Sequence, residues 1–558
     1  MILRPRKQDH LLIGKYTGKI VIGVGILMLI PLVTSLVFQE WDTAVDFVIS
    51  MSACFIFGFG TQLVCRTERD LSWSHGLVVA SGSWIVATIL GALPHWLSGH
   101  EGSYLDAMFD VMSGYTTTGM YLLQDLDHIS RGLNMWRHLL TYAGGQGIVV
   151  IALTFLFKGT AGAYKVYVGE GKDERLLPNV VQTARAIWLV SLTWLGIGTA
   201  ALFGTGILLG QDPVRAFLHG LWVFMGAWST GGFAPQSYNT LWFHSISYEV
   251  VTVVIMIAGS LNFALHWALW TGNRKEVRRN IETVSFATTL MVITIVATFW
   301  LAKAGVYPDA MSLFRKAFYQ LASGHTTTGF STIYSKAFIS QWGPVGMIAT
   351  TIAMAIGASA CSTGGGIKGI RLGIITKAFL QDIRRMISPE SAVVRAKFHH
   401  IRDIFLEDGL VRSALTITVA YLTMYALASF MGTLYGWVAQ HGLQPTGMPG
   451  AVYLTAPDEV PESQAAWELQ TALVGSPAPS APDESGCGVR QNPAIQVAFT
   501  MHRGPYDTVS DTYSQLGQWT ATNGFAMVGP PQEVYLSDPA EVPPEEYLTE
   551  IRFPVSRG

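Results

Sequence analysis

Three short segments of small polar residues could coordinate a cation through their backbone carbonyls. They run from Thr116 to Gly119, from Ser229 to Gly232 and from Thr326 to Gly329, each after a half-length apolar stretch too short to cross a bilayer. Glycine widens the backbone geometries open to such a segment, and a ring of converging carbonyls replaces the hydration shell of K⁺. One copy would suggest a polar turn at a helix end, but three in register favour a cation filter. The predicted filter residues are Thr116, Thr117, Thr118, Gly119, Ser229, Thr230, Gly231, Gly232, Thr326, Thr327, Thr328 and Gly329.

The stretches before these segments form an internal repeat. They read AMFDVMSGYTTTG (107–119), AFLHGLWVFMGAWSTGG (216–232) and AFYQLASGHTTTG (317–329), and a full-length apolar run follows each. Half-length helices here would direct their negative C-terminal ends at one place, which favours a cation. A repeat of span, half-length helix, polar segment and span is typical of transport proteins.

A fourth glycine-rich stretch has a different setting. Residues 357–368 read GASACSTGGGIK, follow an apolar run with no half-length helix before them, and end at basic residues. This favours a flexible internal gate, while the alternative is a small-residue patch for helix packing. The predicted gate residues are Gly357, Gly364, Gly365, Gly366, Lys368 and Arg371.

The composition predicts that a membrane positions these segments. Of 558 residues, 13% are charged and 50% hydrophobic, and the mean hydropathy is +0.34, whereas soluble proteins carry about 25% charge. The formal charge of −2 excludes a strongly basic nucleic-acid binder. Four scattered cysteines without a CxxC pair argue against a disulfide scaffold or a structural zinc site.

Basic residues predict the orientation of the spans. They gather at the N-terminus, at 158–175, at 274–279 and at 368–402, on alternate loops, so this face and the N-terminus are expected to be cytoplasmic. The expected apolar segments are 19–38, 44–65, 76–97, 136–157, 183–208, 246–270, 284–304, 342–360 and 410–430.

The first 430 or so residues resemble the Trk/Ktr/HKT superfamily of potassium uptake proteins. The matching stretches are SGYTTTGM, WRHLLTYAGGQGIVVIAL (136–153), WSTGGF, SGHTTTGFSTI and GASACSTGGGIKGIR. Two extra spans before the first repeat suggest the bacterial TrkH branch.

The resemblance implies four membrane–pore–membrane repeats around one K⁺ pathway in a homodimer, and a cytoplasmic TrkA-type nucleotide-binding regulatory partner. It implies the inner membrane as the location, K⁺ as the transported ion and no covalently bound cofactor. Gly364 to Gly366 fall in the family's intramembrane gating loop, and Arg371 matches a basic residue below the filter. The residues at the family's filter positions are Thr117, Thr118, Thr230, Gly231, Thr327 and Thr328.

The residues after 432 form a tandem duplication. Trp437 aligns with Trp519, Tyr453 with Tyr535 and Glu468 with Glu550 at one constant offset. The phrases VAFTMHRGPYD, EVYLSDPAEVPPEE and LTEIRFPV resemble the GyrI-like small-molecule-binding domain. By that resemblance Glu550, with Tyr535 and Trp519 nearby, lines a pocket for an amphipathic, often cationic ligand. The alternative is a solvated strand glutamate with core aromatics.

The expected fold is therefore an α-helical polytopic membrane protein with membrane–pore–membrane repeats and a C-terminal α+β duplicated ligand-binding domain. The family's fourth filter segment and final span are missing after 410–430, which leaves a fusion, a chimeric reading frame or a misread last span open. The predicted parts are 1–72 (two extra spans), 73–180, 181–280 and 281–390 (repeats 1 to 3), 391–432 (first span of repeat 4) and 433–558 (GyrI-like).

The expected function is potassium uptake driven by the membrane potential. Alternatives are a less selective Na⁺/K⁺ pathway, and a non-conducting or chimeric membrane protein whose GyrI-like tail binds an amphipathic small molecule. We expect no enzymatic activity, because histidines and acids are scattered, and no nucleic-acid partner, because the formal charge is −2. His399 and His400 are expected to be a solvated loop pair.

Overall fold

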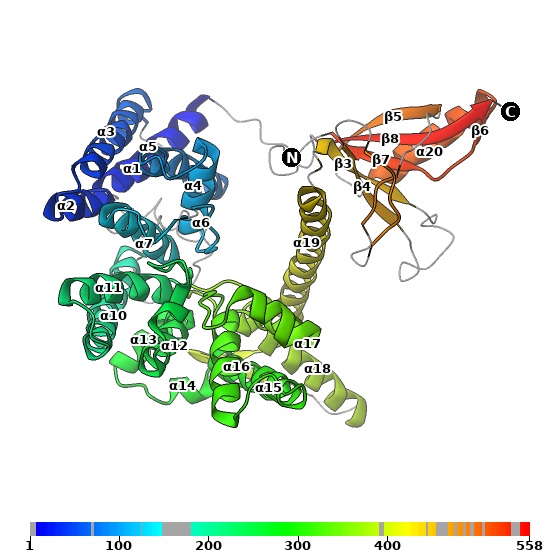
Figure 1. Ribbon diagram of the computed structural model, residues 1–558. Helices are drawn as coiled ribbons and strands as arrows, with labels where there is room; N and C mark the ends of the chain where they lie inside the picture. The colour runs from blue at the N-terminus through cyan, green and yellow to red at the C-terminus, as the bar shows by residue number, and fades with distance from the viewer. Residues whose placement is uncertain are drawn as a thin grey trace. The chain divides into compact units, whose positions relative to one another are not determined.

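A computed structural model of the chain divides into two units, Met1–Thr418 and Val419–Gly558. Figure 1 gives the element labels. The predicted basic cluster at 158–175 lies outside the residues that the structure describes. These are residues 7–67, 72–123, 125–147, 180–389, 395–441, 443, 445–453, 467–473, 477–483, 487–490, 496–504, 508–536 and 547–557.

Ahead of the repeats, the first unit begins with the helices α1 and α2 and with the long helix α3, which packs against both. Helices α1 and α3 approach closely because glycine lies at the contact: a Cβ on Gly58 would stand 2.9 Å from the carbonyl oxygen of Gly18. Large apolar side chains on the outer faces of these helices are exposed, as expected for surfaces in contact with lipid. These elements are α1 (Lys7–Leu27), α2 (Leu29–Val37) and α3 (Trp41–Val64), and α4 (Trp73–Gly91) and α5 (Leu93–Leu97) then begin the first repeat.

The described residues contain three successive sets of helix, half-length helix, polar segment and helix; the span predicted at 136–157 is described only to Gly147. In the third repeat the half-length helix α16 packs against both α15 and α17, which also contact each other (Figure 1). The first repeat comprises α4, α6 (Tyr104–Tyr115) and α7 (Arg131–Gln146). The second comprises α10 (Val180–Leu208), α11 (Pro213–Trp228), the 3₁₀ helix η1 (Asn239–Phe243), α12 (Ile246–Ser260), α13 (Phe263–Trp270) and α14 (Glu276–Arg279). The third comprises α15 (Ile281–Lys303), α16 (Ala310–His325) and α17 (Ser335–Ile356).

Each half-length helix starts at a side-chain cap. Ser103 accepts a hydrogen bond from the Asp106 amide before α6, Asp212 from the Val214 and Arg215 amides before α11, and Asp309 from the Ser312 amide before α16. Such caps satisfy amides that have no partner within the helix. The three helices are therefore fixed at one end and deliver their C-terminal carbonyls to the polar segments.

Two predicted spans differ in shape from a straight helix. The span predicted at 246–270 is the pair α12 and α13, which meet at an angle of 101°. The span predicted at 342–360 starts earlier, at Ser335, and is kinked at Gly343, where φ is 62°, just before Pro344. Among the described residues six helices are long and apolar enough to cross a membrane, or seven if the bent pair counts as one span.

The third repeat continues into a helix, a hairpin and a further long helix. α18 (Gly369–Ile387) follows the glycine-rich loop, and β1 (Lys397–His400) pairs antiparallel with β2 (Arg402–Phe405). α19 (Asp408–Gln440) then contains the apolar segment predicted at 410–430 and extends past it. This one helix crosses both the division between the two units and the predicted boundary at 432.

The second unit contains an antiparallel sheet with strand order β4-β3-β7-β8-β5, and β6 pairs with β8. The helix α20 (Val509–Thr522) covers one face of it (Figure 1), where Leu516 packs with Ile551 and Phe553. The strands are β3 (Pro445–Tyr453), β4 (Trp467–Leu473), β5 (Val497–Arg503), β6 (Phe525–Met527), β7 (Gln532–Tyr535) and β8 (Leu548–Arg557).

The register of this sheet repeats the duplication predicted from the sequence. Val452 of β3 stands opposite Glu468 of β4, and Val534 of β7 stands opposite Glu550 of β8. Val452 corresponds to Val534, and Glu468 to Glu550, at the same offset that aligns the two copies in the sequence. The central pair of the sheet, β3 with β7, joins the two copies.

Candidate ion filter and gate

The three filter segments share one backbone conformation. The second residue of each, a threonine in all three, has a positive φ, 53° at Thr117, 52° at Thr230 and 60° at Thr327, and the last glycine of each has a φ between 72° and 84°. A positive φ is an outlier for a β-branched residue and costs about 1–3 kcal/mol, so it persists only where the surroundings enforce it. Alternation of the sign of φ turns successive carbonyls toward one side of the chain.

The segments lie edge to edge in chain order. A Cβ on Gly119 would stand 2.5 Å from the carbonyl oxygen of Gly231, and one on Gly232 would stand 2.1 Å from that of Thr328. The equivalent Cβ on Gly329 meets no described atom within 4 Å. Gly119 and Gly232 thus each face the next segment, whereas Gly329 faces no described residue.

Burial supports this arrangement. All four residues of the middle segment, Ser229 to Gly232, are buried, whereas Thr116 and Thr118 of the first segment and Gly329 of the third are exposed. The middle segment has neighbouring segments on both sides, whereas each outer one has such a neighbour on one side only among the described residues. The described residues therefore provide three sides of a ring.

Helix-packing glycines that the sequence reading did not single out bring the following spans onto the filter. A Cβ on Gly144 of α7 would stand 2.0 Å from the Tyr115 carbonyl oxygen, and one on Gly259 of α12 would stand 2.1 Å from that of Trp228. Both carbonyls end a half-length helix. In the sequence, these two positions could have been identified as glycines within the predicted apolar segments 136–157 and 246–270.

The loop predicted as a gate, residues 357–368 (the gate loop), lies against two filter segments. The Thr363 hydroxyl donates to the Trp228 carbonyl at 2.9 Å or to the Gly259 carbonyl at 2.8 Å, and lies 3.4 Å from the Thr230 hydroxyl. The Gly365 amide donates to the Thr327 hydroxyl at 2.8 Å. The loop therefore contacts the strained threonines of segments two and three directly.

The other predicted gate residues hold this loop folded. Gly357 and Gly366 have positive φ and pack against each other, with a Cβ–Cα separation of only 2.5 Å if either carried a side chain. The Lys368 ammonium donates to the Gly364 carbonyl, and Arg371 donates to the Ile367 carbonyl at 2.8 Å. Two cations thus neutralise carbonyl dipoles at the exit of the loop.

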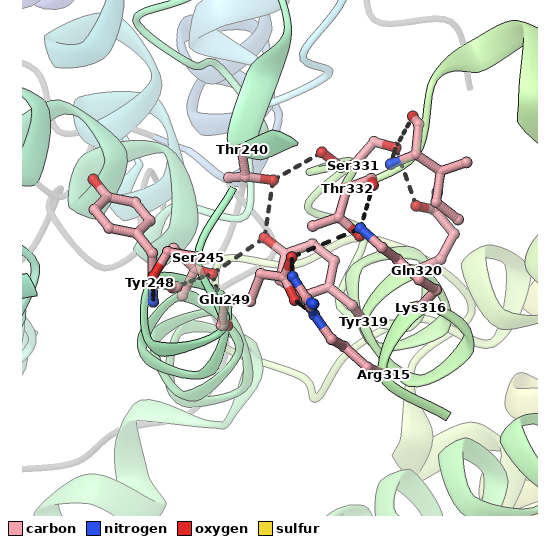
Figure 2. Close-up of polar contacts among 12 residues, drawn as sticks. Thr240, Ser245, Tyr248, Glu249, Arg315, Lys316, Tyr319, Gln320, Ser331 and Thr332 are labelled. Carbon is pink, nitrogen blue, oxygen red and sulfur yellow. Dashed lines mark hydrogen bonds and ion pairs between the residues drawn. The ribbon is translucent and has the colours of Figure 1, made fainter. Parts of the chain in front are cut away.

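A polar network joins the second and third repeats beside the filter (Figure 2). Glu249 of α12, 6% exposed, accepts two hydrogen bonds from Arg315 of α16, at 2.5 and 2.7 Å. Lys316 stands 3.8 Å from the same carboxylate and donates to the Thr332 carbonyl at 2.7 Å. The network orients the third half-length helix, and no sequence motif pointed to Glu249.

A hydroxyl chain extends this network toward the segment that follows the middle filter segment. The Tyr319 hydroxyl lies 3.1 Å from both Thr252 and Thr240, and Thr240 donates to the Ser331 carbonyl at 2.9 Å (Figure 2). Asn239, with a φ of 55°, contacts the Gly232 carbonyl and the Ser331 amide. The second and third filter segments are thus tied by side chains as well as by backbone packing.

In the second unit the predicted ligand residues lie on different surfaces. Glu550 alternates along β8 with Ile551, which packs on α20, so Glu550 faces away from that helix and pairs with Arg552 at 2.8 Å. Trp519 belongs to α20 and stacks on Phe525. The expectation that Trp519 lies near Glu550 is therefore wrong, because the strand alternation separates them.

A different carboxylate, that of Glu533, contacts an aromatic residue. Glu533 of β7 is buried and accepts a hydrogen bond from the Tyr513 hydroxyl of α20 at 3.0 Å. Tyr535 stands opposite Thr549 in the sheet register. The alternation of β7 could have identified Glu533, since it shares a face with the buried Ile551 opposite it.

The expectation that His399 and His400 form a solvated loop pair is also wrong. Both lie on β1; His400 is buried, and His399 bridges two carboxylates, Asp403 at 2.6 Å and Glu276 at 2.9 Å. These hydrogen bonds raise the pKa of His399, that from Asp403 most. Burial opposes the ionised form of Glu276, but the hydrogen bonds from His399, Asn280 and Ile401 outweigh it and lower the Glu276 pKa.

Comparison with known proteins agrees with the geometry of the first unit. The profile of the TrkH family, described as a cation transport protein, matches residues 44–432. The chain belongs to the TrkH family. An uncharacterized cation transporter of Methanocaldococcus jannaschii is 28% identical over 78% of this chain and 84% of its own length. The Trk system potassium uptake protein TrkH of Halomonas elongata is 28% identical over 75% of this chain and 84% of its own length.

A solved TrkH-family structure has the same fold. The potassium transporter TrkH from Vibrio parahaemolyticus superposes with a TM-score of 0.63 at 24% identity, over 78% of this chain and 86% of that one. The profile of the GyrI-like small molecule binding domain matches residues 415–556. The two profiles overlap on α19, so this TrkH-family chain continues through one helix into the second domain.

Proposed function

We propose that this chain mediates potassium uptake across the cell membrane through the pathway bounded by the three filter segments. The observation that carries this is the repeated strained backbone at Thr117, Thr230 and Thr327, with glycines packed on neighbouring carbonyls. Carbonyls held in this way replace the hydration shell of K⁺ without reorganisation as the ion enters. K⁺ is the transported substrate rather than a resident cofactor, and the chain acts as a transporter and not as an enzyme.

The membrane potential drives entry in this proposal. A monovalent cation moving inward gains about 2.3 kcal/mol per 100 mV. The C-terminal ends of α6, α11 and α16 meet the filter segments, so their partial negative charges lower the energy of a cation there. Carbonyls held at a spacing that suits K⁺ coordinate the smaller Na⁺ less well. Competition between K⁺ and Na⁺ for uptake measures this selectivity.

The gate loop controls passage beneath the filter in this proposal. Its contacts to Thr230 and Thr327 bring it to the pathway, and its glycines give it the freedom to move. Gly357, Gly364, Gly365 and Gly366 supply that freedom, while Lys368 and Arg371 hold the loop in the observed position. Release of the loop is then the opening step.

The free edge at Gly329 favours a second candidate function. With no described neighbour there, the chain is a non-conducting membrane protein unless another element closes the ring, and its GyrI-like domain then supplies the activity by binding an amphipathic small molecule. Glu550 remains the proposed carboxylate for a cationic ligand, on the face of the sheet that points away from α20. Substitution Glu550→Gln should weaken binding of a lipophilic cation to the purified chain, and unchanged affinity would reject its role.

The assembly follows the family resemblance. We propose a homodimer in the inner membrane with the N-terminus in the cytoplasm, served by a TrkA-type nucleotide-binding regulatory subunit. Cross-linking in intact membranes tests the dimer, and protease accessibility of the second unit tests the orientation.

Growth of a bacterial strain that lacks its own potassium uptake systems tests the proposed function. We expect the chain to restore growth at low external K⁺, and Gly232→Ala to abolish the rescue. A version with a restored fourth repeat separates the two candidates: rescue by that version alone would mean that the native chain does not conduct by itself.

A further inference from the structure

We propose that the β1–β2 hairpin is a latch for the gate loop, closed by His399 and transmitted through Glu276, Asn280 and Glu282. The inference rests on the proposed function, since it concerns the gate of the same pathway. The hairpin comprises residues 397–405, and Arg279 of α14 lies 3.6 Å from its Asp403.

The hairpin is anchored to the short helix α14 by one carboxylate. Glu276 accepts hydrogen bonds from the His399 ring at 2.9 Å, from the Ile401 amide at 3.0 Å and from the Asn280 side chain at 3.0 Å. Glu276 itself is 2% exposed. A buried carboxylate with these donors ties the turn of the hairpin to the residues that precede α15.

The next residues carry the connection to the gate loop. The Asn280 side-chain oxygen accepts from the Glu282 amide at 2.9 Å and lies 3.4 Å from the His400 ring. Glu282, 1% exposed at the start of α15, accepts from the Ala360 amide of the gate loop at 2.7 Å. A continuous path of polar contacts therefore runs from the hairpin to the gate loop.

Apolar packing makes the hairpin a docked element rather than a free loop. Phe398, 4% exposed, belongs to one cluster with Ile281 of α15, Ile374 of α18 and Ala414 of α19. The Ala396 amide also donates to Gln381 of α18 at 3.2 Å. Since α18 begins where the gate loop ends, displacement of the hairpin disturbs both ends of that loop.

The protonated imidazole completes the latch. The two ring nitrogens of His399 lie 2.6 Å from Asp403 and 2.9 Å from Glu276, and only the imidazolium can donate to both carboxylates, because neutral imidazole has a single N–H. The other charges near it are Lys397 and Arg279, both paired with Asp403 at 3.1 and 3.6 Å. Loss of the proton leaves a nitrogen lone pair against a carboxylate and weakens docking.

The native Cys361, inside the gate loop, reports release of the loop directly. In a full chain in which Cys361 is the remaining cysteine (Cys54→Ala, Cys65→Ser, Cys487→Ser), the rate of reaction with a water-soluble methanethiosulfonate measures loop accessibility. At pH 6 we expect His399→Gln and Glu276→Gln to raise this rate about three- to tenfold, since each removes a hydrogen bond to a charged group. Because two different variants are used, the test still works if one of them fails to fold.

A matched histidine supplies the control. His128 is also bonded to an aspartate, Asp125 at 2.9 Å, which raises its pKa, and it lies in a loop outside the latch. His128→Gln should leave the Cys361 rate unchanged. Equal Cys361 rates in His399→Gln, Glu276→Gln and the unsubstituted protein would overturn the latch.

Uptake of ⁸⁶Rb⁺ by liposomes containing the same variants separates the latch from the proposed function. Faster Cys361 labelling together with faster uptake supports both. Faster labelling with no uptake in any variant keeps the latch and rejects conduction by this chain. Uptake in the unsubstituted protein with neither rate changed in the variants rejects the latch and keeps conduction.

Discussion

The ion pair between Glu249 and Arg315 should be a main determinant of how the third half-length helix is held. Arg315 donates to both oxygens of a carboxylate that is nearly buried. Removal of one partner from a buried pair costs about 3–5 kcal/mol. Because the Arg315 side chain is 27% exposed and Lys316 remains 3.8 Å away, we expect Arg315→Gln to lower the free energy of unfolding by about 2 kcal/mol.

A double-mutant cycle measures the pair itself. Arg315→Gln, Glu249→Gln and the double variant are compared by reversible unfolding in mixed micelles, and the coupling energy should be about 1–2 kcal/mol. The Glu40–Arg131 contact offers a matched control, because its charged atoms are 4.0 Å apart and the Arg131 side chain is 52% exposed. That second cycle should give a coupling below about 0.5 kcal/mol.

The same variants test whether the pair serves the filter. Since α16 leads directly into Thr326, tilting the helix displaces the third filter segment, so Arg315→Gln should also reduce discrimination between Rb⁺ and Na⁺. A coupling energy no larger than that of the control pair would refute the reasoning.

Further predictions concern the filter, the gate loop and pH. Gly232→Ala places a methyl group 2.1 Å from the Thr328 carbonyl oxygen and should abolish uptake. Gly329→Ala has a similar φ but no described neighbour within 4 Å, and it should retain uptake. Equal loss of uptake in both variants would argue that the positive φ alone matters. Thr363→Val removes the donor shared by the Trp228 and Gly259 carbonyls, at a cost of about 1–3 kcal/mol, and should speed Cys361 labelling; an unchanged rate would show that this contact does not hold the gate loop. Because its partners raise the pKa of His399 above 6.5, its stabilisation of the hairpin should be complete below pH 6.5 and lost as the pH rises through the raised value. Cys361 labelling, corrected with a chain whose remaining cysteine is Cys487, should therefore accelerate with pH, and a flat corrected profile would contradict this.

The filter could be predicted from the sequence because its signal is repeated and local. TTTG, STGG and TTTG each follow a half-length apolar stretch, and the same small polar residues adopt the same φ values in the structure. The tandem duplication of the second unit was equally visible, since one offset aligns both the sequences and the strand registers. Each pattern would be weak if it occurred once, and its repetition is what made the filter and the duplication predictable.

The contacts that join the repeats could not be predicted in this way. Glu249 of α12 lies 66 residues before Arg315, and Thr252 lies 67 residues before Tyr319, so only tertiary packing brings α12 and α16 together at these contacts. His399 and Glu276 are a similar case, where a histidine in a polar stretch suggested solvent although the hairpin docks it against a buried carboxylate. The sharp bend between α12 and α13 depends on Asn262, whose side chain caps α13, a signal too short to distinguish from a polar residue within a span.

The most direct test of the central claim is ⁸⁶Rb⁺ uptake into liposomes that contain the purified chain and an outward K⁺ gradient. We predict uptake that rises with an inside-negative potential, is inhibited by external K⁺ more strongly than by Na⁺, and is absent with Gly232→Ala. Uptake no greater than in protein-free liposomes, with correctly folded and inserted protein, would contradict the account.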